Sequence, residues 1–190
     1  MGVVTPTQGK SAKRINEPSL LKGDATSPRK NGNRIVAFIV NDKTPRWGAG
    51  FALAARRKWP GVQDQFVRWA DQNPNNLKLG YIHAIEIEPS LLAVMLIAQH
   101  GYGDSAKPRI RYSALHSCLQ KLAALAKEQN ASVHMPRLGS GQARGHWPII
   151  AEMIEQSLTN REIDVTIYDL PNAQPKQKTQ GFLNFSKTVA

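Results

Sequence analysis

Two glycine-rich segments contain the residue types best suited to holding a ligand. Gly48-Ala49-Gly50 follows an apolar run at residues 35–40 through the sequence NDKTPRW. Gly139-Ser140-Gly141 follows a short apolar run at residues 132–135 and leads to a third glycine, Gly145. A pattern typical of a helix comes after each segment, so both sets of glycines lie between a strand and a helix N-terminus.

Such loops can hold an anion, and two of them on neighbouring strands can hold a diphosphate from both sides. Exposed N–H groups and the positive end of a helix dipole attract negative charge, and glycine lets phosphate oxygens approach the backbone. Taken singly, each loop is equally typical of a plain turn or helix cap. Neither segment matches the dinucleotide fingerprint, because Gly145 is one position late, or the P-loop, because no Gly-Lys-Ser/Thr follows.

The apolar pattern predicts a layered fold that would position these loops. Continuous apolar runs at 35–40 and 91–98 are typical of strands covered on both faces, and a mixed strand at 81–88 indicates an antiparallel hairpin. Further strands are expected at 132–135 and 165–168, and helices at 50–59, 62–71, 112–129 and 148–160. With a first strand before Asp24, the order β-β-α-α-β-β-α-β-α-β predicts a three-layer α/β/α sandwich around a mixed, largely parallel sheet. Ligands of such sheets bind at the carboxyl ends of the strands.

Length and composition indicate one intracellular domain. A chain of 190 residues, 41% of them hydrophobic, is long enough for one well-buried domain. The single cysteine, Cys118, excludes an internal disulfide or a cysteine-based metal site. The first residues have no apolar signal core, and no apolar run approaches the roughly 20 residues of a membrane span. We therefore expect a cytoplasmic or nuclear protein with no membrane contact.

The net charge of +11 is concentrated at the two ends of the chain. Residues 1–30 contain six Lys or Arg and two acidic residues, and residues 172–190 contain three Lys and no acidic residue, so seven of the eleven charges lie there. We expect a flexible basic N-terminal segment at 1–18 and a basic C-terminal tail at 172–190. Solvated tails are the simplest interpretation, and non-specific contact with polyanions is the alternative.

Four segments together resemble the macro domain, the ADP-ribose-binding family. In chain order they are LLKGDATSP (20–28), IVNDKTPRWGAGFALAARRKWP (39–60), ASVHMPRLGSGQARGHW (131–147) and VTIYDLP (165–171). The sequence LIAQH before a long polar loop is similar to the branch containing the macro domain of the poly(ADP-ribose)-activated chromatin remodeller and the terminal ADP-ribose protein glycohydrolase. The resemblance covers about residues 19–171 and implies a macro domain there, with ADP-ribose or ADP-ribosylated macromolecules as partners.

The resemblance also implies roles for matching residues. Asp24 would accept a hydrogen bond from the adenine amino group, and Ala25 would add a backbone contact. Asn41 would face the distal ribose, and Tyr168 would line the adenine pocket. The ligand-contacting residues expected in the two glycine loops are Gly48, Ala49, Gly50, Phe51, Pro136, Leu138, Gly139, Ser140, Gly141, Gln142 and Ala143.

Several of these residues have a purely structural interpretation as well. Asp24 is then a turn aspartate, Asn41 only ends a strand, and Tyr168 is a half-buried core aromatic. Trp47 and Trp147, beside the loops, either cover the distal ribose or pack as wedges.

The histidines and the cysteine suggest no further chemistry. The histidines of interest, His100, His134 and His146, have no carboxylate or cysteine at ligand spacing, so we expect no metal site. His134 on its short strand is interpreted as a hydrogen-bonded core histidine, and Cys118 has no activating neighbour in the sequence.

The residues implied for hydrolysis are missing. In the glycohydrolase branch, a lysine just after the strand equivalent to 91–98 attacks the anomeric carbon, and an aspartate in the second glycine loop assists proton transfer. Here the lysine position is Gln99 or His100, and the aspartate position is Ala143. A binding protein is therefore favoured over an enzyme.

Three functions remain open. The favoured one is recognition of ADP-ribose, or of ADP-ribosyl groups on protein or nucleic acid, without turnover and without a cofactor. The second is an ADP-ribosyl hydrolase with a non-standard catalytic set, in which Asn41 orients a water or Asp104 and Lys107 contribute from the loop after residue 100. The third is a nucleic-acid-binding module in which the glycine loops no longer hold a ligand.

Overall fold

A computed structural model describes residues 17–73 and 75–170. Residues 1–16 of the predicted N-terminal segment and the whole of the predicted tail at 172–190 lie outside these ranges. Within them, no helix is both long enough and apolar enough to cross a bilayer.

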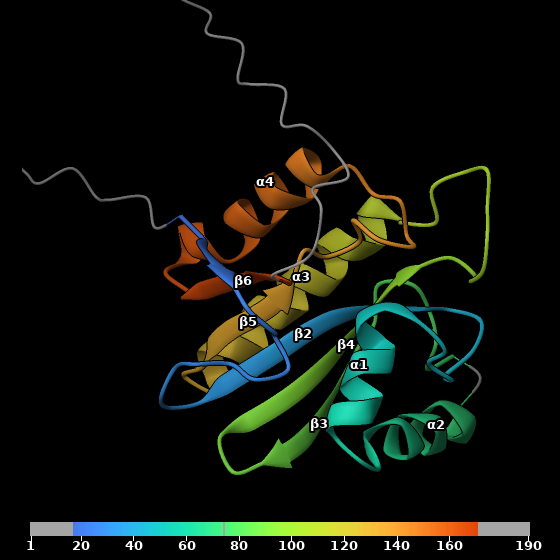
Figure 1. Cartoon of the computed structure of the whole chain (residues 1–190), viewed down its shortest axis with the longest axis horizontal. Coiled ribbons are helices and arrows are strands. Elements are labelled where there is room, and N and C mark those ends of the chain that lie inside the picture. The colour runs from blue at the N-terminus through green and yellow to red at the C-terminus, as the bar shows by residue number, and fades with distance from the viewer. Residues whose placement is uncertain (1–16, 74, 171–190) are drawn as a thin grey trace, which may run out of the picture.

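The centre of the fold is a six-stranded sheet with the order β1-β6-β5-β2-β4-β3 (Figure 1). All neighbouring strands are parallel except β3 and β4, which form the predicted antiparallel hairpin. The mixed, largely parallel sheet is thus confirmed. The strands are β1 (Ser19–Lys22), β2 (Arg34–Asn41), β3 (Ile82–Glu88), β4 (Leu91–Gln99), β5 (Ser132–Pro136) and β6 (Val165–Asp169).

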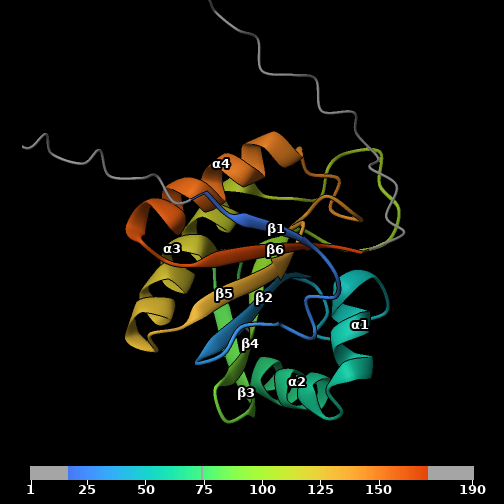
Figure 2. The ribbon, with the colours of Figure 1, turned by 60° about the vertical axis from the view of Figure 1, so that its left-hand side comes forward.

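Helices cover both faces of the sheet, which confirms the three-layer sandwich (Figures 1 and 2). On one face lie α1 (Gly50–Lys58) and α2 (Val62–Gln72), and on the other lie α3 (Tyr112–Glu128) and α4 (Trp147–Ser157). The helix predicted at 148–160 ends earlier than expected. The chain leaves the α-helix after Ser157 and makes a single 3-10 turn, η1 (Thr159–Arg161).

The central strands are apolar throughout because each face of the sheet has its own core. Along β2, Ile35 and Ala37 pack in the core beneath α3 and α4, whereas Val36 and Phe38 pack in the core beneath α1 and α2. Strand β4 alternates in the same way. A strand buried on both sides needs no polar positions, which explains the unbroken run at 35–40.

At the β5–β6 end of the sheet, a buried histidine takes part in the core. The His134 side chain is fully buried, and its ring nitrogens are hydrogen-bonded to the Ser132 hydroxyl at 2.9 Å and the Tyr168 hydroxyl at 3.2 Å. The backbone N–H of Arg29 also donates to the Tyr168 hydroxyl, at 3.3 Å. The interpretation of His134 as a hydrogen-bonded core histidine is confirmed. Burial lowers its pKa to about 4.

Acidification should therefore destabilise the fold through His134. In the unfolded chain the pKa of His134 returns to about 6.5. The contribution of the neutral imidazole to the free energy of unfolding is therefore fully present above that pH and is lost as the pH falls toward 4. The full effect is on the order of 3 kcal/mol, because each pKa unit corresponds to about 1.4 kcal/mol. Urea unfolding at pH 7.5, 6.0 and 5.0 measures this loss of stability. Between these pH values, the free energy of unfolding of His134→Gln should fall less steeply than that of wild type. The matched control is His116→Gln, on the exposed side of α3, which should keep the wild-type slope; an unchanged slope in His134→Gln would contradict the assignment.

Candidate functional site

The predicted ligand-binding residues gather at one edge of the sheet, where the five parallel strands end. Asp24 follows β1, Tyr168 lies near the end of β6, the second glycine loop follows β5, and Asn41 ends β2. Neighbouring strands lie about 4.8 Å apart, so the ends of β1 and β2 are separated by roughly 14 Å. The site is therefore a row of side chains and loops along the sheet edge.

The first glycine loop leaves a group of backbone N–H donors free. The Asn41 amide oxygen caps the start of the loop, accepting from the N–H groups of Lys43 at 2.8 Å and Thr44 at 2.9 Å. In contrast, the N–H groups across residues 48–50 have no acceptor among the described residues. Helix α1 begins at Gly50 without a side-chain cap or an acidic residue in its first turn. Free donors at an uncapped helix N-terminus favour an anion.

The second loop has free donors at its tip. The Arg144 N–H bonds the Gly141 carbonyl at 3.0 Å, and the Gly145 N–H bonds the Gly139 carbonyl at 2.8 Å, which closes the loop on itself. The N–H groups of the exposed residues Gly141 and Gln142 find no acceptor in the described part of the chain. Since β2 and β5 are neighbours, the two sets of free donors lie at adjacent strand ends.

The three glycines of this loop have different tasks. Gly139 has φ +66°, and a Cβ there would lie 3.1 Å from Ile110 and 3.2 Å from Ile150. A Cβ on Gly145 would lie 2.7 Å from Ile150 and 3.1 Å from the Gly139 carbonyl oxygen. At Gly141 an added Cβ would meet open space, and its φ is not positive. Gly139 and Gly145 are thus needed for the loop's shape, whereas Gly141 keeps its outer surface clear.

Asp24 is a turn aspartate that keeps one carboxylate oxygen unengaged by the described residues. One carboxylate oxygen accepts a hydrogen bond from the Thr26 N–H at 2.9 Å, as a turn aspartate does. The other oxygen has no hydrogen bond to a described residue, and the side chain is exposed. The neighbouring Ala25 is buried, with only 2% of its surface exposed.

Other predicted contact residues are buried or partly buried by the fold. Phe51 packs on Phe38 with ring centroids 5.3 Å apart, and Leu138 and Ala143 lie in the core beneath α3 and α4. Tyr168 is only 3% exposed, which favours its interpretation as a core aromatic over an open stacking surface. Trp47 is a packing wedge, 5.5 Å from the ring of Phe38 and 5.3 Å from that of Phe66.

Two interactions that the sequence pattern did not indicate hold the edge in shape. Arg137 makes a bidentate ion pair with Asp169, at 2.5 and 2.7 Å, which joins the ends of β5 and β6. Its guanidinium also lies 4.8 Å from the centre of the Trp147 ring. The charge of Arg137 is thereby balanced within the protein.

The sequence pattern also did not indicate a carboxylate–imidazole pair, formed by Asp42 and His100. Asp42 follows β2 and His100 follows β4, and the Asp42 Oδ2 lies 2.8 Å from the His100 Nδ1. The other carboxylate oxygen accepts from the Gly101 N–H at 2.9 Å. Sequence spacing did not indicate this carboxylate partner of His100, because it lies 58 residues away, after the adjacent strand. A prediction that pairs the two apolar strands would have found it.

The surroundings of Asp42 keep its carboxylate charged. Burial alone would raise its pKa, but the hydrogen bonds from Gly101 and His100, with the positive charge of His100 and Lys43, lower it below the usual value. No three metal-ligating side chains come together within residues 17–73 and 75–170.

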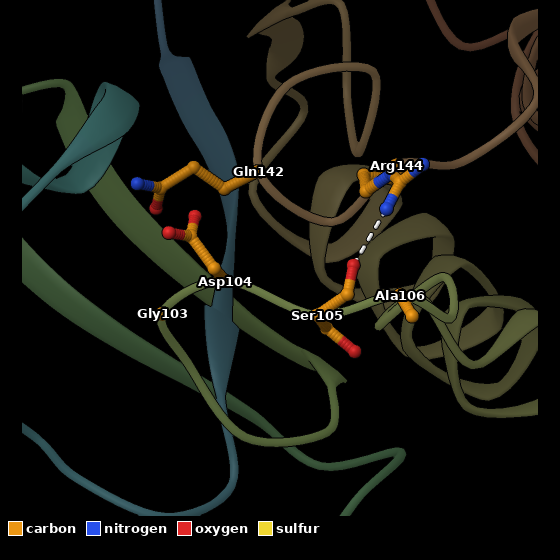
Figure 3. Close-up of a pocket in the computed structure, with 6 residues that line it drawn as sticks. All are labelled: Gly103, Asp104, Ser105, Ala106, Gln142 and Arg144. Atoms are coloured by element: carbon orange, nitrogen blue, oxygen red, sulfur yellow. Dashed lines mark hydrogen bonds between the residues drawn. The ribbon is translucent and has the colours of Figure 1, made fainter.

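A cleft of about 590 Å³ lies between the second glycine loop and the loop at 101–111. Asp104 and Gln142 extend into it from opposite sides (Figure 3). The Arg144 guanidinium joins the two loops by donating to the Ser105 carbonyl at 2.5 Å. Within the loop at 101–111, the Arg109 guanidinium donates hydrogen bonds to the carbonyls of Gly103 and Asp104 at 3.0 and 2.8 Å, which stabilises the loop.

Comparison with known proteins identifies the family. No family model matches the chain. A macrodomain protein from Streptomyces coelicolor is 37% identical with a TM-score of 0.71, and the match covers 80% of this chain and 99% of that one. The chain belongs to the macrodomain family.

Other relatives agree with the predicted branch of the macrodomain family. Mouse chromodomain-helicase-DNA-binding protein 1-like is 26% identical over 163 residues, and the match covers 82% of this chain but only 18% of the mouse protein. The chain therefore spans under a fifth of that relative. DarTG of Thermosipho africanus, whose structure is a complex with ADP-ribose, shares the fold at 20% identity and a TM-score of 0.67. That match covers 84% of this chain and 43% of the DarTG chain.

The different tasks of the glycines can be separated by alanine substitution. Gly139→Ala should lower the free energy of unfolding by roughly 1–2 kcal/mol, because an L-residue is strained at positive φ and the new Cβ is crowded. Gly141→Ala should stay within about 0.5 kcal/mol of wild type, as an exposed substitution without strain does. Thermal and urea unfolding followed by circular dichroism measure both. Equal destabilisation by the two variants would show that the loop's shape does not depend on Gly139.

Proposed function

We propose that this macrodomain binds ADP-ribose, or an ADP-ribosyl group carried by a protein or a nucleic acid, along the carboxyl edge of the sheet. The observation that carries the proposal is the position of the free N–H donors. Those at 48–50 and those of Gly141 and Gln142 follow neighbouring strands, so a diphosphate between the loops would be held from both sides. Helix dipoles at the start of α1 and α4 add to the attraction.

The order of the strands then sets the direction of the ligand. Asp24 lies two strands beyond β5, and its free carboxylate oxygen suits the adenine amino group, since a carboxylate only accepts hydrogen bonds. The distal ribose falls at the opposite end, beside Asn41. Because the Asn41 oxygen caps the loop, its amide N–H₂ is the group left to donate to ribose oxygens.

The comparisons support the ligand class. The Streptomyces coelicolor relative is a macrodomain protein, and the DarTG chain of the same fold binds ADP-ribose. We place the domain at residues 19–171, with the basic ends as an additional, salt-sensitive attraction for polyanionic carriers. The proposal is one of recognition, because the positions of the branch's lysine and aspartate are held by Gln99 or His100 and by Ala143.

Substitution of Asp24 tests the adenine end. Asp24→Ala removes a charged hydrogen-bond acceptor worth about 1.5–3 kcal/mol, so the Kd for ADP-ribose in calorimetric titration should rise roughly 10- to 150-fold. Asp24→Asn keeps an oxygen for the Thr26 N–H and separates the turn from the ligand contact. Asp71→Ala, on an exposed position of α2, is the control that should bind as wild type does.

The outcomes of that titration are distinct. An unchanged Kd in Asp24→Ala would place the adenine elsewhere. Failure of the wild type to bind at millimolar ADP-ribose would reject the proposal and leave the nucleic-acid-binding alternative.

Substitution of Gly141 tests the diphosphate position. Gly141→Glu places bulk and negative charge beside the phosphates and should abolish measurable ADP-ribose binding, whereas thermal stability should stay near that of wild type because the position faces open space. Gly141→Gln has the same size without the charge, and it should bind more weakly than wild type but better than Gly141→Glu. If both variants bind with wild-type affinity, the diphosphate does not lie at this loop.

A further inference from the structure

The first glycine loop has a sharp boundary between engaged and free N–H groups. From residue 42 to residue 47, every backbone N–H has an acceptor, apart from Pro45, which has no N–H. The acceptors are the Gln99 carbonyl, the Asn41 amide oxygen, the Thr44 hydroxyl and the Gln63 amide oxygen. Across residues 48–50 the N–H groups have no acceptor among the described residues. Trp47 is therefore the last fixed point before the free donors.

The acceptor for Trp47 comes from a different element of the fold. The Trp47 N–H donates to the Oε1 of Gln63, a half-buried residue of α2, at 2.6 Å. Sixteen residues separate the two partners. The bond thus closes the segment 48–62, which contains the free donors and the whole of α1.

A second contact with α2 holds the same tryptophan. The centre of the Trp47 ring lies 5.3 Å from that of Phe66, which is fully buried. Gln63 and Phe66 are three residues apart on the helix, so they lie one turn apart on the same face. The Trp47 Nε1 is buried without a hydrogen-bond partner in the described part of the chain, so packing alone holds the ring. Backbone and ring are thereby attached to α2 at two adjacent points.

The loop itself has little else to fix its direction. A Cβ added to Gly48 or to Gly50 would meet no atom within 4 Å, which shows that the surroundings of these glycines are open. Helix α1 begins at Gly50 without a side-chain cap. The packed residues nearest to the free donors are Trp47 on one side and Phe51, which contacts Phe38, on the other. The orientation of the donors thus depends on these two neighbours.

We propose, resting on the proposed function, that Gln63 is a positioning residue for the diphosphate of the ligand. Its amide oxygen holds the Trp47 N–H and so sets the direction of the N–H groups at residues 48–50. Donors that are already oriented bind an anion without the entropy cost of ordering them. Helix α2, which contributes none of the predicted contact residues, takes part in ligand binding through this one side chain.

Substitution of Gln63 in the full chain tests the role of the oxygen. Gln63→Met has a similar length but no amide oxygen, and it should raise the Kd for ADP-ribose in calorimetric titration by roughly 5- to 50-fold. Gln63→Glu keeps an oxygen acceptor but adds a negative charge near the diphosphate. Its affinity should be below wild type at low salt and should approach wild type, compared at the same salt, at about 0.5 M, because salt screens the repulsion. The deficit of Gln63→Met should persist at both salt concentrations.

NMR of the backbone amides separates positioning from a general loss of structure. At saturating ADP-ribose, Gln63→Met should show smaller ligand-induced shifts than wild type at residues 48–50, whereas Gly141 and Gln142 should respond as in wild type. Hydrogen exchange of the Trp47 amide should become faster in this variant, because its acceptor is gone. The matched controls are Gln65→Met and Gln65→Glu, at an exposed position of α2, and both should keep the wild-type Kd.

The opposing outcomes are specific. If wild type binds ADP-ribose and Gln63→Met binds it equally well, the inference is overturned and the proposed function stands. Equal loss of the ligand response at both glycine loops in Gln63→Met would also overturn it, since the side chain would then support the fold as a whole. So would a Gln63→Glu variant that binds no better than Gln63→Met at high salt. Absence of ADP-ribose binding by wild type would reject the proposed function itself.

Discussion

The parallel pairing of β2 with β4 on one side and β5 on the other is the constraint on which the site depends. Parallel strands end at the same edge, so whatever follows them is brought together there. The two glycine loops and the Asp42–His100 pair are local features of three separate segments, and none would form a site in isolation. The interior of β2, apolar on both faces, stabilises this pairing through burial in two cores.

Much of the fold could be predicted from periodicity, and the reasons are local. The run at 35–40 is too short for a membrane span and too uniformly apolar for a half-exposed strand, which leaves a central strand. Pro89-Ser90 between two apolar runs indicates a hairpin. The end of α4 was harder to predict from the sequence, because apolar residues continue through Leu158 although the α-helix ends at Ser157.

The site was predictable to the level of loops and less so to the level of side chains. Glycine spacing after a strand identifies a candidate anion site, but it does not distinguish Gly139, which the fold requires, from Gly141, which it does not. That difference depends on Ile110 and Ile150, whose proximity is tertiary. The Asp42–His100 pair depends on strand order, and burial of Tyr168 depends on packing of the segment that follows β1. The spacing of residues in the sequence reveals neither the strand order nor this packing.

The direction of the parallel strands also determines where a label or a surface can be attached to this domain without blocking the candidate site. The chain enters β1 at the edge opposite the site and leaves β6 at Asp169, next to the Arg137 ion pair and two strands from the first glycine loop. In the proposed binding mode, residue 17 therefore lies at the edge opposite the ligand, whereas residue 170 lies at the same edge as the proposed adenine position. The two ends of the described part of the chain are thus not equivalent as points of attachment: a bulky group attached directly at residue 170 would compete with the carrier for space, and one attached directly at residue 17 would not.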